Sequence, residues 1–277
     1  DIMERLERAF ENCEKLQRHM HFLLNKGGLY KVYNGNLLYH GCVPLKEDGN
    51  LKSVRIFGRA YKGKGLYEVL ESYVRKGFYA MDPKEKERGK DIMWYIWLSE
   101  NSPLFGKDKM ATFERYFLSE KETHKEKKNP YYLLLEDEKV VEKILKEFGL
   151  ENEDAHIING HVPVKCKDGE NPVKCGGKVL VIDGGFSKAY QKETGIAGYT
   201  LIYNSYGLNL TAHEPFTSKA DAVARETDIV SNRVAVSYMS RRQLVGDTDT
   251  GHALKERIQE LIQLLDAYRT GIIKEKK

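Results

Sequence analysis

The amino-terminal part of the chain changes from a helical to a strand-like pattern of apolar residues. Across residues 2–24, apolar side chains recur every three or four positions between charged ones, which predicts one amphipathic helix. Two strand-like runs, 29–33 and 36–40, then flank Asn34-Gly35, the strongest short signal for a β-hairpin. We therefore expect a helix followed by a hairpin whose second strand is closed by His40.

The middle of the chain, from about residue 50 to residue 150, is highly charged and helical in pattern. Apolar residues recur at helical spacing in four segments: 65–76, 84–98, 109–119 and 137–148. Aromatic residues are frequent in this block: Trp94, Tyr95, Trp97, Phe105, Phe113, Tyr116 and Phe117. We interpret them as helix packing, with a stacking platform for bases or sugars as the alternative. The block is expected to be an insertion or a cap.

Strand-like patterns return in the last part of the chain. The runs are short, rich in β-branched residues and separated by Gly, Asn or Pro: 155–158, 178–182, 199–204, 208–212 and 233–238. An amphipathic helix over 252–268 follows, and Thr248, Asp249 or Thr250 is expected to cap it. Strands on both sides of a helical block predict an α/β protein.

Charge and composition exclude several classes of function. The chain has 45 basic and 41 acidic residues, which are interspersed and give a net charge of only +4, so no nucleic-acid partner is expected. No stretch reaches the roughly 18 to 20 apolar residues that span a bilayer, so no membrane partner is expected either. The four cysteines show no C-x-x-C spacing, which favours free thiols in a reducing cytoplasm.

Two histidines share one local pattern. At His40 and again at His161, an apolar strand-like run stops at a histidine beside a glycine, and a proline follows within four residues. Glycine allows close approach of a ligand and proline stiffens the exit of the loop, so the pair could form half of a metal site. The alternative for each is a hydrogen-bonded core or loop histidine. A hard dinuclear site would also require oxygen ligands.

Lysines and an acidic strand end follow His161. Lys165 and Lys174 are interleaved with glycines, and a strand-like run then leads into Asp183 and Gly184. A carboxylate and exposed backbone amides at a sheet edge could meet a metal and a phosphate. The alternative for Asp183 is a simple turn cap.

Several motifs resemble one enzyme family. Gly160-His161-Val162-Pro163, followed by Ile182-Asp183-Gly184-Gly185, resembles the carboxy-terminal signature of calcineurin-like metallophosphoesterases. Tyr39-His40-Gly41 resembles their preceding histidine motif. Segments 102–110 and 195–201 look like the class III fructose-1,6-bisphosphatases of Firmicutes, and the resemblance covers essentially the whole chain.

The resemblance implies a dinuclear, manganese-dependent hydrolase that acts on the 1-phosphate of fructose 1,6-bisphosphate in gluconeogenesis. It implies an α/β fold: the carboxy-terminal half of a calcineurin-like αββα sandwich, with mixed and antiparallel strands and a helical insertion. His40 and His161 would be metal ligands, and Asp183 would lie either behind the metal ligands or beside the substrate. For the intact enzyme we expect Lys165, Lys174, Asp183 and Gly184 to contact the substrate, with solvated loop lysines as the alternative for Lys165 and Lys174. The implied parts are a core segment 1–50, an insertion 51–150, a second core segment 151–245 and a final helix 246–277.

The chain also departs from the family pattern. The motifs G-D-x-x-D-R-G and G-N-H-[DE], which would supply the bridging carboxylate and the catalytic side chains, do not occur in it. We therefore expect a carboxy-terminal portion that is inactive without an amino-terminal half. Its other candidate partners are a sugar bisphosphate and a second copy of the chain. The alternatives are another calcineurin-like phosphatase, acting on proteins or dinucleotides, and a non-catalytic assembly or regulatory domain.

Overall fold

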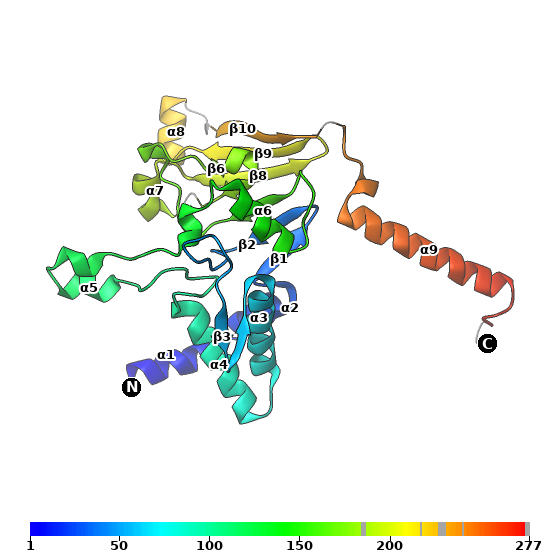
Figure 1. Ribbon diagram of the computed structural model, residues 1–277, viewed down its shortest axis with the longest axis horizontal. Helices are drawn as coiled ribbons and strands as arrows, with labels where there is room; N and C mark the ends of the chain where they lie inside the picture. Colours follow the sequence, from blue (N-terminus) through cyan, green and yellow to red (C-terminus); the bar gives the residue numbers. More distant parts are fainter. Residues whose placement is uncertain (184–186, 217, 227–230, 240, 275–277) are drawn as a thin grey trace. The chain divides into compact units, whose positions relative to one another are not determined.

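The computed structural model describes residues 1–183, 187–216, 218–226, 231–239 and 241–274 (Figure 1). The chain divides into two compact units. The first consists of Asp1–Val32, Leu37–Val162 and Lys174–Val181, and the second of Tyr33–Asn36, Pro163–Val173 and Ile182–Lys277. The four-part division predicted from the sequence stays a prediction.

Two helices, and not the single one predicted over 2–24, form the amino terminus. They are α1 (Ile2–Glu11) and α2 (Glu14–Lys26). The break has a local cause at Asn12, whose side-chain Nδ2 donates to the Arg8 carbonyl at 2.7 Å. Asparagine commonly ends a helix by competing in this way for backbone groups.

A five-stranded sheet contains the predicted hairpin. Its strand order is β1 (Tyr30–Tyr33), β2 (Asn36–Tyr39), β5 (His156–Asn159), β7 (Val179–Val181) and β6 (Val173–Lys174). The strands β5 and β7 are parallel and buried along their whole length. Burial along the whole strand is typical of parallel strands that are covered on both faces.

The block between the two histidines contains the four predicted helices and a hairpin that was not predicted. The helices are α3 (Gly63–Tyr79), α4 (Pro83–Leu98), α5 (Thr112–Phe117) and α6 (Glu138–Glu147), with 3₁₀ turns η1 (Lys121–His124) and η2 (Pro130–Leu133). The hairpin pairs β3 (Val54–Ile56) with β4 (Arg59–Tyr61). Its three-residue strands are too short for periodicity to reveal, and Phe57 occupies a turn position with φ +45° that glycine usually fills.

Five of the seven aromatic side chains singled out in this block are exposed, so the prediction that they pack between helices is wrong for these five: Trp94, Trp97, Phe113, Tyr116 and Phe117. Trp94 and Trp97 are 69% and 66% exposed, because α4 turns the opposite face, with Ile92 and Ile96, toward the core. The helix α5 buries no residue at all. Phe105 is buried, as predicted, but it lies in a loop.

The second unit is built on an antiparallel sheet and ends in a long helix. Its strands, in the order β10-β9-β8, are β8 (Gly198–Asn204), β9 (Gly207–His213) and β10 (Ser231–Tyr238). Its helices and 3₁₀ turns are η3 (Cys166–Asp168), α7 (Lys188–Thr194), α8 (Lys219–Arg225), η5 (Val245–Asp247) and α9 (Asp249–Arg269). One further turn, η4 (Cys175–Gly177), precedes β7 in the first unit. The α/β class with mixed and antiparallel sheets is confirmed. Among the described residues, no helix is both long and apolar enough to cross a membrane.

Two glycines set the contact between α3 and α4. A Cβ added at Gly77 would lie 2.5 Å from the Gly89 Cα atom, which no packing tolerates. We expect Gly77→Ala to lower the free energy of unfolding by about 1 to 3 kcal/mol, as for an overpacked core. Gly65→Ala in the same helix is the control, because nothing lies within 4 Å of its added Cβ. Urea unfolding of both variants tests this, and equal stabilities would contradict it.

A buried pair of tyrosines supports the strand that leads to His40. The hydroxyls of Tyr39 and Tyr131 bond at 2.7 Å, and both side chains are buried. Removing one hydroxyl by Tyr131→Phe leaves the other without its partner, at an expected cost of about 1 to 3 kcal/mol, whereas the double variant with Tyr39→Phe should recover most of the loss. Thermal unfolding of the single and double variants measures this coupling. Additive losses would show that the bond contributes nothing.

Candidate functional site

The two histidines singled out by the sequence lie against each other. His40 follows the last residue of β2 and His161 lies two residues beyond β5, and these strands are neighbours in the sheet. His40 Nε2 lies 3.0 Å from His161 Nδ1, and the ring centroids are 4.8 Å apart. The Gly160 amide donates to the His40 carbonyl at 2.9 Å, which joins the two strand ends. The structure therefore brings together side chains that are 121 positions apart.

The backbone at His161 is strained. Its φ is +67°, in the left-handed region that residues other than glycine rarely occupy. The Val162 amide donates to the Gly160 carbonyl at 2.8 Å, which fixes this tight turn. Strain of this kind persists where the surrounding structure holds it in place, and it clusters at functional sites.

A loop of the helical block holds the imidazole of His161. His161 Nε2–H donates to the Phe105 carbonyl oxygen at 2.9 Å. A carbonyl only accepts, so in the neutral ring the proton lies on Nε2 and a lone pair remains on Nδ1, toward His40. Metal-binding histidines commonly donate the other ring N–H in this way, which fixes the tautomer.

The same loop also packs against the His40 motif. The Cys42 amide donates to the Pro103 carbonyl at 2.9 Å, and a Cβ at Gly41 would lie only 2.5 Å from that oxygen. Glycine is therefore required beside His40 for a close backbone approach. Segment 102–110 carries part of the family resemblance, but its role in the site was not predicted, because no local sequence pattern marks a carbonyl that accepts a bond from a distant histidine.

The spacing of the two imidazoles fits a single metal ion. Two nitrogens bound at about 2.1 Å with an angle near 90° lie about 3.0 Å apart, which is the separation between His40 Nε2 and His161 Nδ1. In the part of the chain that the structure describes, no group of three or more His, Cys, Asp or Glu side chains is placed to hold a metal. The pair thus offers two nitrogen ligands of a larger set, and its role as a metal site stays a prediction.

The side chains that bond the backbone next to His40 are buried and uncharged. Tyr67 donates to the Cys42 carbonyl at 2.9 Å, and burial raises the pKa of the Cys42 thiol to about 12, so the thiol stays neutral. Asn159 Nδ2 donates to the Gly41 carbonyl at 2.9 Å. Among the described residues, the buried Asn159 Oδ1 receives no hydrogen bond. An acceptor of this kind is costly to leave without a donor.

The predicted substrate residues lie in both units. Lys174, in the first unit, forms an ion pair with Glu136 at 3.7 Å. In the second unit, the Lys165 side chain is exposed, and the Asp183 carbonyl accepts from the Val164 amide at 2.8 Å. Gly184 lies outside the described residues. Their contact with a substrate stays a prediction.

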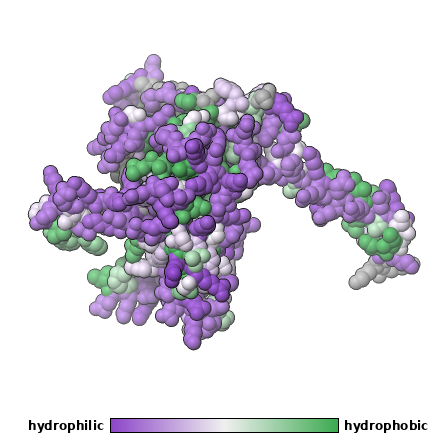
Figure 2. Space-filling view, viewed as in Figure 1, coloured by the Kyte–Doolittle hydropathy of each residue, from purple (hydrophilic) through white to green (hydrophobic). Residues whose placement is uncertain are grey.

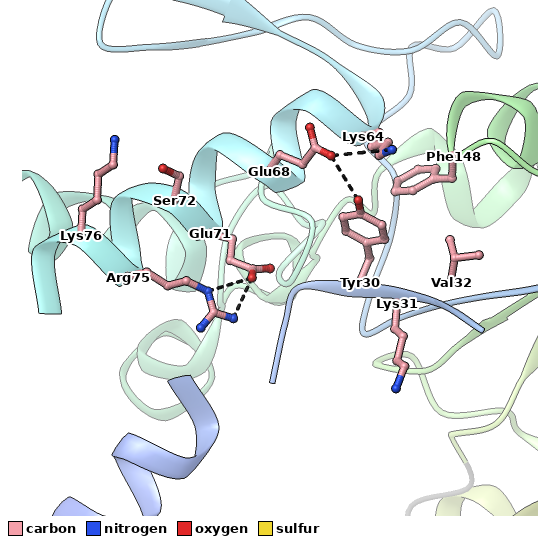
Figure 3. A pocket seen from close by; sticks show the side chains of 10 residues that line it. All are labelled: Tyr30, Lys31, Val32, Lys64, Glu68, Glu71, Ser72, Arg75, Lys76 and Phe148. Carbon is pink, nitrogen blue, oxygen red and sulfur yellow. Dashed lines mark hydrogen bonds and ion pairs between the residues drawn. The ribbon is translucent and has the colours of Figure 1, made fainter. Parts of the chain in front are cut away.

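A separate cavity of about 800 Å³ lies between β1 and α3 (Figure 3). Its two carboxylates are paired within the chain: Glu68 accepts from Tyr30 at 3.2 Å, and Glu71 contacts Arg75 at 2.7 Å. Burial and the Glu68 carboxylate raise the pKa of Tyr30. No histidine or cysteine lines this cavity. The paired charges indicate a structural role, and the histidine pair remains the candidate site.

Comparison with known proteins confirms the resemblance seen in the sequence. The sequence model described as Firmicute fructose-1,6-bisphosphatase matches residues 1–270. A class 3 fructose-1,6-bisphosphatase of Clostridium botulinum (strain Loch Maree / Type A3) is 56% identical over 276 residues, 99% of this chain and 41% of the relative. The class 3 fructose-1,6-bisphosphatase of Clostridioides difficile (strain 630) is 55% identical over 276 residues, which are 99% of this chain and 42% of the relative.

No solved structure matches the chain. The chain spans about two fifths of the length of the curated relatives it matches. With a match over residues 1–270, it belongs to the Firmicute fructose-1,6-bisphosphatase family.

Proposed function

We propose that this chain is part of an enzyme that hydrolyses fructose 1,6-bisphosphate to fructose 6-phosphate and phosphate. The observation that carries the proposal is the pair of strand-end imidazoles, His40 and His161, with ring nitrogens 3.0 Å apart in a chain of this family. We further propose that the pair binds manganese. A bound divalent ion would act as a Lewis acid toward a phosphoryl oxygen.

In this proposal, the chain's own contribution is preorganisation. The Phe105 carbonyl holds the His161 ring and its tautomer, and the join between the Gly160 amide and the His40 carbonyl keeps the two strand ends in register. A ligand pair that is already in place need not be ordered when an ion arrives, so binding costs less conformational entropy. The strained backbone at His161 fits this role.

The remaining ligands are proposed to come from the part of the relatives that this chain does not span. Manganese prefers carboxylate and other oxygen ligands, and two imidazoles alone do not satisfy it. The absent motifs G-D-x-x-D-R-G and G-N-H-[DE] carry such groups. The Asn159 side-chain oxygen, buried without a donor among the described residues, supports the arrival of a further polar group at this edge.

We propose that Lys165 and Lys174 neutralise the charge of the substrate phosphates and that Asp183 and Gly184 lie beside the substrate. Lysine serves phosphates as a point charge. The pair between Lys174 and Glu136 is 3.7 Å long and partly exposed, and pairs of this kind are worth only about 0 to 1 kcal/mol. A doubly charged phosphate would therefore displace it readily. The four free thiols support the cytoplasmic location proposed for this enzyme.

Activity is expected to require more than these 277 residues. Phosphate release from fructose 1,6-bisphosphate with manganese should be at least about 1,000-fold slower for this chain alone than for the full-length protein, because the bridging carboxylate is absent. A coupled assay at equal molar concentrations measures this, with glucose 6-phosphate and a dinucleoside polyphosphate as comparison substrates. A rate for the chain within tenfold of the full-length rate would refute the proposal of a shared site.

Removing either imidazole from the full-length protein should lower manganese-dependent turnover at least about 100-fold, since even groups that merely support a metal ligand cost 10- to 100-fold. The variants are His40→Ala and His161→Gly, the latter because glycine keeps the φ of +67° without strain. His19→Ala, an exposed histidine on α2, is the matched control and should retain full activity. Manganese content per chain is measured alongside the rate. Unchanged content in both variants would contradict the assignment of His40 and His161 as metal ligands.

A further inference from the structure

A buried asparagine precedes His161 by two residues and contacts the loop of His40. Most polar side chains of a folded protein face water, and the surface in Figure 2 is largely hydrophilic. Asn159, the last residue of β5, is by contrast only 2% exposed. It follows the buried residues Ile157 and Ile158, where a further apolar residue would continue the strand. Burying an amide group at this position is costly unless its hydrogen bonds serve the structure.

Two successive carbonyls beside His40 accept hydrogen bonds from the end of β5. The Gly160 amide donates to the His40 carbonyl at 2.9 Å. Asn159 Nδ2 donates to the next carbonyl, that of Gly41, also at 2.9 Å. Both donors belong to the segment that leads into His161. The Asn159 side chain therefore adds a second tie between the two histidine segments, one residue beyond the backbone bond.

The second tie restrains a rotation that the first one allows. A single hydrogen bond acts as a pivot, because a carbonyl oxygen accepts over a broad range of directions. Gly41 itself offers little resistance, since a residue without a Cβ has a permissive backbone. Metal ligands must be held within roughly 0.5 Å and 10 to 20° of their working geometry. Rotation of one segment would therefore separate the ring nitrogens of His40 and His161, which lie 3.0 Å apart.

The same side chain brings a cost to the fold. Among the described residues, Asn159 Oδ1 has no hydrogen-bond donor, and a buried acceptor without a donor destabilises the folded state. Leucine has a similar size and would remove this oxygen together with the bond to the Gly41 carbonyl. Stability and site geometry are therefore expected to separate at this position: leucine should change the geometry and leave the stability nearly unchanged.

We infer that Asn159 is a positioning residue of the proposed phosphatase: through the Gly41 carbonyl, it holds the His40 ring at the distance from His161 that one metal ion requires. The inference rests on the proposed function, because it concerns the same histidine pair. Asn159 does not bind the ion in this assignment and acts only through the backbone beside His40.

The contact between the two rings tests the geometry without a metal. In nuclear magnetic resonance spectra of the 277-residue chain, a nuclear Overhauser effect should connect the rings of His40 and His161, whose centroids are 4.8 Å apart. The effect should be lost in Asn159→Leu and in Asn159→Val, the latter a smaller residue that suits a strand. Circular dichroism should show that the variants are folded. A ring contact that survives in a folded variant overturns the inference.

Asn36 provides the matched control. It is 6% exposed, begins β2 of the same sheet, and its Oδ1 also has no partner among the described residues. Its Nδ2 donates to the carbonyls of Tyr33 and Asn34, which belong to neither histidine segment. Asn36→Leu should therefore keep the ring contact. Loss of the contact in this variant as well would refute a specific role for Asn159.

The manganese affinity of the full-length protein separates this inference from the proposed function. Measured by the paramagnetic resonance signal of free Mn²⁺, the affinity should fall about 10- to 100-fold in Asn159→Leu, as it does when other groups that orient metal ligands are removed. Asn36→Leu should bind as the parent does. If His161→Gly lowers the affinity and Asn159→Leu does not, the inference fails and the metal site stands. If neither variant lowers it, the proposed metal site fails, and the inference with it.

Discussion

The candidate site depends on one close backbone approach, between Gly41 and the loop that contains Pro103. The gap of 2.5 Å to an added Cβ leaves no room for any side chain at position 41. The approach lets the Cys42 amide bond the Pro103 carbonyl and sets the neighbouring Phe105 carbonyl against His161. The helical block between the two histidine motifs is thus part of the candidate site.

Local chemistry predicted much of the fold. Asn34-Gly35 marked the hairpin, Thr248 capped α9, and the helices near 65–76 and 137–148 followed from their periodicity. These features depend on residues a few positions apart. The break at Asn12 was missed because a single side-chain bond outweighed a continuous apolar stripe.

The site was predictable only in part. His40 and His161 were singled out because the sequence around each shows the same pattern of strand, glycine and proline. The structure brings their rings together. The contact between His161 and Phe105 could not be foreseen, because a backbone carbonyl carries no sequence signature. Exposure of Trp94 and Trp97 was also missed, since composition does not say which face of a helix meets the core. What sequence patterns cannot supply here is the pairing of distant segments.

The use of a carbonyl at Phe105 has a consequence for mutagenesis. Every residue type has the same backbone carbonyl oxygen. Replacing the Phe105 side chain therefore leaves the acceptor for His161 in place. A conventional alanine scan would therefore report this loop position as a matter of packing alone. Only changes that displace the backbone, such as a deletion within 102–106 or a bulky residue at Gly41, would reveal that the histidine is held from there.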